Sequence, residues 1–155
     1  MYGVSKIDVI EEVALISFNG IPLHLPLLPE IFQGFADEEI VIDMISQTAP
    51  VGDTINISFT CMDRDIVKVL QLSKELGERH AGIKPMVTSG NCKLQLYGAE
   101  MRTTHGVFAR LLTCLSGLDI GIKQITTSEV DISLLVGAPD LDRALEAVRK
   151  GFQVR

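Results

Sequence analysis

Residues 92–98, with the sequence CKLQLYG, are predicted to form an apolar strand that ends at Gly98. A similar apolar strand occurs earlier, at residues 13–20 with the sequence VALISFNG, and ends at Gly20. In both places a helical pattern follows, in which large apolar residues recur at the spacing of helix turns. The fold is therefore decided by a strand-to-helix unit that is present twice.

The repeat extends beyond these strands and helices. The apolar positions that match at an offset of 80 residues are Ile31, Phe32 and Phe35 with Leu111, Leu112 and Leu115, and Ile40, Ile42 and Ile45 with Ile120, Ile122 and Ile125. Residues 57–59 then match residues 132–134 at an offset of 75, which gives the first copy five additional residues in a turn near residues 48–53. Because the apolar register survives this change of offset, the chain is predicted to contain two copies of one unit.

Each copy is predicted to contain a strand, a helix, two strands and a second helix. Period-two alternation at residues 54–59 and 129–134 indicates strands with one buried face, and residues 64–76 and 141–152 have helical patterns. Further strands are expected at residues 3–9 and 83–88. The order predicts an α+β fold of two ferredoxin-like βαββαβ units, with antiparallel sheets and helices on one face. We expect a leading strand at 1–10 that could complete the second unit, a first unit at 11–88 and a second unit at 89–155.

Composition excludes several classes of function. The 155 residues carry a formal charge of −6, which disfavours nucleic acid as a partner because such binding needs a basic surface. We also expect no membrane span, because no apolar run reaches the roughly 20 residues that one requires. Three cysteines at irregular spacing indicate reduced thiols in the cytoplasm. The mean hydropathy of +0.29 is high for a soluble monomer and predicts a homodimer.

The sequence contains no motif for phosphate binding, dinucleotide binding, serine hydrolysis or a structural zinc site. We therefore expect no cofactor, no metal and no catalytic residues, although an enzyme that uses His105 as a base with Glu129 is one alternative. Another alternative is a purely structural dimerisation module.

Two polar loops of the second copy are candidates for a binding site. Residues 98–107 lead into a helix N-terminus, where unpaired N–H groups and the helix dipole favour a carboxylate. The simpler interpretation is that Thr103 or Thr104 caps the helix. Residues 125–130 place three consecutive hydroxyls and Glu129 between two strands, where they could bind an ammonium or could form an ordinary turn. Together, the two loops would suit an amino acid.

The corresponding loop of the first copy, residues 19–27, is apolar and has Pro26 at the position of the helix start. This loop is therefore predicted to be better suited to packing against apolar residues than to binding a free carboxylate. Asp43, Gln47 and Thr48 would form its polar rim.

The chain resembles tandem ACT domains, and specifically the regulatory region of aspartokinases. The resemblance rests on residues 98–107 (GAEMRTTHGV), residues 125–133 (ITTSEVDIS) and residues 40–47 (IVIDMISQ). It departs from the family in the first loop, where residues 23–26 replace an Asp-x-Pro-Gly motif, and at His105, where proline is common.

The resemblance implies that the chain binds lysine or threonine as an allosteric effector and acts on an aspartokinase catalytic domain or subunit, although a stand-alone amino-acid sensor is an alternative. The implied effector-binding residues are Met101, Thr103, His105, Gly106, Val107, Thr126, Thr127, Ser128 and Glu129 of the second copy, with Asp43 and Gln47 of the first.

Overall fold

The computed structural model describes residues 1–23 and 26–155, and His24 and Leu25 of the apolar loop at residues 19–27 lie outside the described residues. The chain divides into two compact units, which we call the first unit (Glu12–Ser89) and the second unit (Met1–Glu11 with Gly90–Arg155). The elements of the first unit are β1 (Lys6–Pro22, from residue 12 onward), α1 (Leu27–Asp37), β2 (Ser46–Gln47), β3 (Thr54–Met62), α2 (Ile66–Arg79) and the start of β4 (Pro85–Tyr97).

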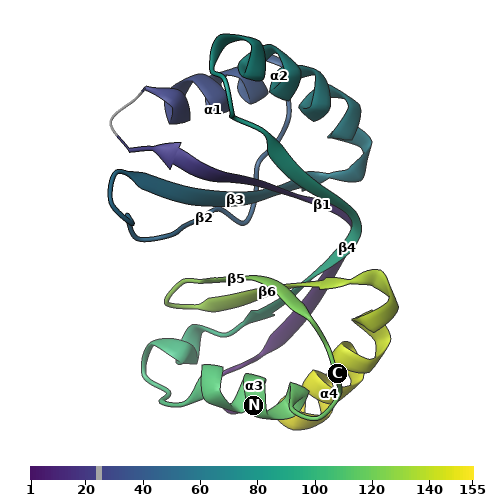
Figure 1. Cartoon of the computed structure of the whole chain (residues 1–155). Helices are drawn as coiled ribbons and strands as arrows, with labels where there is room; N and C mark the ends of the chain where they lie inside the picture. The colour runs from purple at the N-terminus through teal and green to yellow at the C-terminus, as the bar shows by residue number, and fades with distance from the viewer. Residues whose placement is uncertain (24–25) are drawn as a thin grey trace. The chain divides into compact units, whose positions relative to one another are not determined.

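The second unit repeats this order. Its elements are the remainder of β4, a short 3-10 turn (Ala99–Arg102), α3 (Val107–Leu115), β5 (Ile122–Thr127), β6 (Asp131–Gly137), α4 (Leu141–Phe152) and the first residues of β1. Within each unit the two helices cover one face of the antiparallel strands (Figure 1). The strand order β2-β3-β1-β4-β6-β5 gives both units the same internal topology and confirms the predicted pair of ferredoxin-like units.

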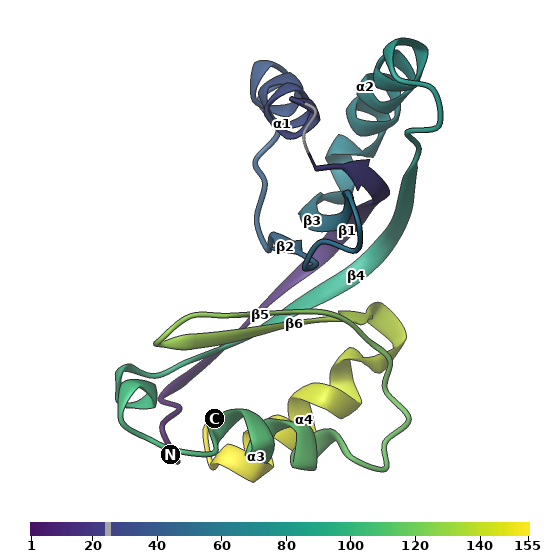
Figure 2. The same cartoon turned by 60° about the vertical axis from the view of Figure 1, so that its left-hand side comes forward.

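Strands β1 and β4 each run through both units, as Figure 2 also shows. The prediction of separate strands at residues 3–9 and 13–18, and at 83–88 and 92–97, was therefore wrong. The division between the units falls within β1 at Glu12 and within β4 at Gly90, and both residues have a positive φ, of 57° and 66°. Each strand continues through its boundary residue in spite of this uncommon backbone conformation, which local periodicity does not reveal.

Each unit has its own apolar core between helices and strands. In the first unit, Phe35 from α1 packs edge-on against Phe59 from β3, with ring centroids 5.3 Å apart. In the second unit, Leu111 from α3 and Val148 and Phe152 from α4 are fully buried against β4 and β6. These helices form because their apolar residues fall on one stripe, which the sheet then covers. Among the described residues, no helix has the length and apolar composition needed to cross a membrane.

One predicted strand is largely missing from the first unit. The predicted order of elements requires a strand between the first helix and residues 54–59, where Ile40, Ile42 and Ile45 lie. Regular pairing with β3 is confined to the two residues of β2, where Ser46 lies opposite Ser58. Before β2, Asp43 donates a backbone hydrogen bond of 3.0 Å to Thr60. The turn that holds the five additional residues follows directly, so the edge of this sheet is irregular where the second unit has the full strand β5.

Candidate functional site

A pocket of about 730 Å³ opens in the second unit between the N-terminus of α3 and the turn that joins β5 to β6. One wall comes from the 3-10 turn and the first residues of α3, and the other from the end of β5 and the start of β6. The lining residues are Met101, Arg102, Thr104, Gly106, Val107, Phe108, Thr127, Ser128, Glu129 and Ile132.

The first wall is held by hydrogen bonds to backbone carbonyls. Gly98 donates to the carbonyl of Val130 over 2.8 Å, which ties the start of this wall to the opposite turn. The hydroxyl of Thr104 donates to the carbonyl of Glu100 over 2.8 Å. Since α3 begins after Gly106 and no side chain of the described residues caps it, the capping role considered for Thr103 or Thr104 is wrong.

Gly106 forms the turn into α3 and has a φ of 77°. This left-handed conformation is unfavourable for most residues other than glycine and asparagine. The first N–H groups of a helix lack partners within the helix, and the dipole adds positive potential at this end. Gly106 and Val107 both line the pocket. The pocket therefore combines a positive helix end with an apolar surface from Val107 and Phe108.

The second wall is a tight turn organised by Ser128. Its hydroxyl oxygen accepts hydrogen bonds from the backbone N–H groups of Val130, over 3.1 Å, and Asp131, over 3.2 Å. The same hydroxyl contacts the carboxylate of Asp131. The turn interpretation of this loop is therefore confirmed for Ser128, whose hydroxyl is already engaged, while Thr127 and Glu129 remain exposed at the rim.

An ion pair joins the two walls. Arg102 Nε lies 3.5 Å from Glu129 Oε2, and the two side chains are 64% and 80% exposed. An exposed pair of this kind contributes little to stability, because water screens both charges. The walls are therefore linked by a contact that is easily broken.

The structure brings together six of the residues proposed from the sequence, namely Met101, Gly106, Val107, Thr127, Ser128 and Glu129. Thr103, His105 and Thr126 belong to the same segments but are not among the lining residues. Because His105 is exposed and lies outside the lining, the geometry gives no support to a base at His105 acting with Glu129.

Sequence reasoning missed four lining residues: Arg102, Thr104, Phe108 and Ile132. Helical spacing could have indicated Phe108, which lies one turn after Thr104 in the approach to α3. Strand alternation could have indicated Ile132, which is buried on the helix-covered face of β6. Arg102 adjoins Met101, but nothing in the local pattern distinguishes it from a solvated surface residue.

In the first unit, Asp43 and Gln47 are both exposed. Gln47 belongs to β2, where it lies opposite Ile57. Neither residue lines the small cavity of about 30 Å³ that lies between α1 and α2 in the described part of this unit.

Comparisons with known proteins agree with this architecture. Residues 94–152 match the model of the ACT domain family. The chain is 32% identical over 143 residues to an aspartokinase of Corynebacterium efficiens, a match that covers 91% of the chain and 34% of that relative. The chain thus spans about a third of the length of the curated relatives that it matches.

Solved structures match over nearly the whole chain. The regulatory subunit of aspartate kinase from Thermus thermophilus superposes with a TM-score of 0.87 at 25% identity, covering 97% of this chain and 99% of that one. A chain of a structure of aspartokinase alpha and beta subunits gives a TM-score of 0.83 at 28% identity, with coverage of 97% and 99%.

The class is therefore that of ACT domains, and the chain is a tandem pair of ACT units. More particularly, this pair resembles the regulatory region of aspartokinases, as the relatives and the structural neighbours together show.

Proposed function

We propose that this chain is the amino-acid-sensing regulatory part of an aspartate kinase and that lysine or threonine binds in the pocket of the second unit. The observation that carries the proposal is the pocket itself, which places a positive helix end opposite the carboxylate of Glu129. An amino acid has a carboxylate and an ammonium in the same short molecule. The N-terminus of α3 would bind the carboxylate, and Glu129 with Thr127 would bind the ammonium or a polar side chain.

Regulation would follow from differential affinity. A ligand shifts an equilibrium between two arrangements only by as much as it binds one of them better than the other. The effector would therefore favour one arrangement of the regulatory units and so alter the activity of a catalytic domain or subunit in the aspartate pathway. By itself the chain should not phosphorylate aspartate, which a coupled assay with ATP tests.

A thermal-shift titration of the full chain tests binding directly. A ligand that binds only the folded state raises the free energy of unfolding by about 2.7 kcal/mol at a hundred times its dissociation constant. We expect lysine or threonine to raise Tm by several degrees, and glycine, alanine and aspartate to have little effect.

Variants locate the site. Glu129→Gln should reduce the shift, whereas Glu146→Gln, which removes the same charge from the exposed surface of α4, should leave it unchanged. Gly106→Asn should also reduce the shift, because asparagine tolerates the left-handed backbone and adds a side chain at a residue that lines the pocket. Equal shifts in all three variants would contradict the site, and no shift with any amino acid would contradict the function.

We also propose that the chain forms a homodimer, which is compatible with a structural role alongside sensing. Val41 and Ile45, near the irregular edge of the first unit, are 77% and 54% exposed. Burying such side chains in an interface would remove apolar area from water. Light scattering should give about twice the chain mass, and Ile45→Lys should lower it, whereas Val51→Lys in the neighbouring turn should not. A wild-type chain that scatters as a monomer of 16.9 kDa would contradict the dimer.

A further inference from the structure

Arg102 and Glu129 are the charged members of the pocket's described lining. Arg102 lies at the end of the 3-10 turn in the first wall, and Glu129 lies in the β5–β6 turn of the second. Their side chains face one another with Arg102 Nε 3.5 Å from Glu129 Oε2. The remaining lining residues are polar but uncharged, or apolar: Met101, Thr104, Gly106, Val107, Phe108, Thr127, Ser128 and Ile132.

The arrangement of charge matches a zwitterion. The pocket presents one guanidinium and one carboxylate from opposite walls, and an amino acid carries one carboxylate and one ammonium. Guanidinium groups bind carboxylates through parallel hydrogen bonds, which gives them directional selectivity that a helix end alone does not provide. Because the existing ion pair is exposed and weak, exchanging its partners for those of a ligand requires little disruption.

We propose that Arg102 and Glu129 form a two-charge clamp for the amino acid, in which Arg102 determines specificity for a free α-carboxylate. This inference rests on the proposed function. When the ligand enters, Arg102 leaves Glu129 and binds the α-carboxylate together with the N-terminus of α3, while Glu129 binds the α-ammonium. Both side chains keep a partner of opposite charge throughout, so no charge is left without compensation. The clamp requires both charged α-groups and disfavours derivatives whose carboxyl group is neutral, whereas the rest of the pocket lining selects the side chain.

A cycle that combines a protein variant with a ligand variant tests the clamp. Isothermal titration calorimetry would measure the affinities of L-lysine and L-threonine, and of their α-carboxamides, for the wild-type chain and for Arg102→Gln. We expect Arg102→Gln to weaken binding of the acid about tenfold, as loss of a charge-assisted contact does. It should leave binding of the amide nearly unchanged, so that the preference for acid over amide falls about tenfold. Arg102→Lys should restore part of this preference. Lysine restores the positive charge but lacks the planar guanidinium that forms two parallel hydrogen bonds with a carboxylate.

Arg149→Gln is the matched control, because it removes the same charge from the exposed surface of α4. It should preserve both the affinity and the preference for the acid. If amino acids bind and Arg102→Gln leaves the acid-to-amide preference unchanged, the clamp is wrong while the sensing function stands. Tighter binding of the acid to Arg102→Gln would also overturn the clamp, because Arg102 would then be a competitor for Glu129. If no amino acid binds the wild-type chain, both the clamp and the proposed function fail.

Discussion

The carbonyl oxygen of Gly3 lies so close to Gly98 that a Cβ on Gly98 would be 1.7 Å from it. Nearby, the backbone N–H of Ser5 donates to the carbonyl of Tyr97 over 2.8 Å. Residues 3–5 therefore pack directly against the start of the loop that forms the first wall of the pocket. Gly20, which occupies the same place in the repeat, has open space around its Cβ position and a φ of 67° instead. The two glycines of the repeat are thus required for different physical reasons.

We expect Gly98→Ala to destabilise the second unit by about 1–3 kcal/mol, because the methyl group would displace the backbone of Gly3. Urea denaturation of the variant would measure this change. Gly121→Ala is the control, since its Cβ would meet nothing within 4 Å. Equal stability of the two variants would show that the close approach of Gly3 and Gly98 is not maintained in solution.

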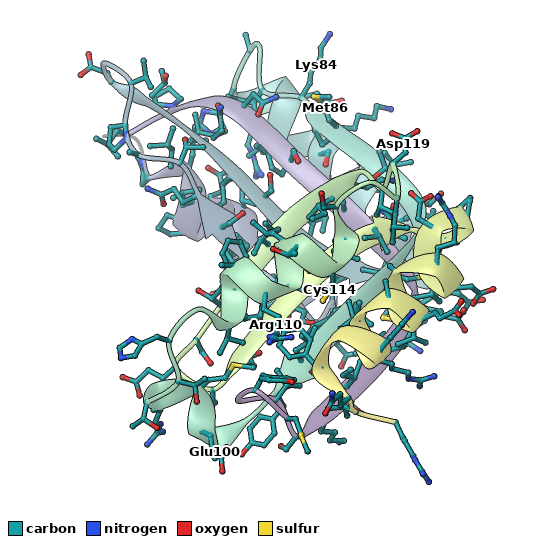
Figure 3. All side chains as sticks on the ribbon, turned by 90° about the horizontal axis from the view of Figure 1, so that it is seen from below. Lys84, Met86, Glu100, Arg110, Cys114 and Asp119 are labelled. Atoms are coloured by element: carbon teal, nitrogen blue, oxygen red, sulfur yellow. The ribbon has the colours of Figure 1, made fainter. Side chains whose placement is uncertain are left out.

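The contact between α3 and α4 predicts that substitution of a second glycine, Gly151, also lowers the stability of the chain. A Cβ on Gly151 would lie 2.0 Å from Cys114 Sγ, and the guanidinium of Arg110 donates to the carbonyl of Gly151 over 3.0 Å. Figure 3 labels Cys114 and Arg110 on α3. Although alanine is intrinsically better than glycine inside a helix, we expect Gly151→Ala to destabilise the chain by about 1–3 kcal/mol through this clash.

A double-mutant cycle separates the clash from other causes. Adding Cys114→Ala to Gly151→Ala removes the sulfur, so the double variant should be more stable than the sum of the single effects indicates. The free energies of unfolding of the four proteins provide the measurement. Additive effects would place the cause outside this contact.

The turn at Ser128 predicts a separation of stability from binding. Ser128→Ala removes the acceptor for the N–H groups of Val130 and Asp131 and should destabilise the second unit by about 1 kcal/mol. Thr127→Val should weaken the ligand-dependent thermal shift and leave the unliganded Tm nearly unchanged. The opposite pattern would assign the ligand contact to Ser128 and the structural role to Thr127.

The thiol of Cys61 should be unreactive. Burial, together with the nearby carboxylates of Asp65 and Asp63, raises its pKa to about 11. At pH 8 a thiol with such a pKa is thiolate in roughly one molecule in a thousand, and the thiolate is the nucleophile. Iodoacetamide labelling of the folded chain, followed by peptide mass spectrometry, should modify the partly exposed Cys114 before Cys61. Labelling of Cys61 first would contradict this.

The same pKa shift makes stability depend on pH. The folded state keeps the Cys61 proton above the pH at which the unfolded thiol loses it, near 8.5. The unfolded state then binds fewer protons, so the free energy of unfolding should fall as pH rises from about 8.5 toward the folded pKa of about 11. Cys61→Ala should show a smaller decline over this range in denaturation experiments. Equal declines would assign the pH dependence to other groups.

Features that depend on local periodicity could be predicted from the sequence. Helix α4 begins at Leu141 and ends at Phe152, within the predicted range, because its apolar stripe has the helical period and Pro139 and Asp140 precede it. Helix α3 begins directly after Gly106, where the loop pattern placed a helix start. The strand expected between Ile40 and Ile45 could not be predicted correctly from local periodicity. Strand formation depends on pairing with a partner strand as well as on the alternation of apolar and polar residues.

By itself, the sequence determined the twofold repeat, the helices and the two loops that contribute to the pocket, because these features are expressed in the spacing of neighbouring residues. Only the tertiary structure decided that β1 and β4 serve both units, that Gly3 lies against Gly98, and that Arg102 faces Glu129. These relationships join segments far apart along the chain. They are stabilised by backbone hydrogen bonds, close packing and electrostatic attraction between these segments. None of these interactions produces a periodic pattern in the sequence of either segment.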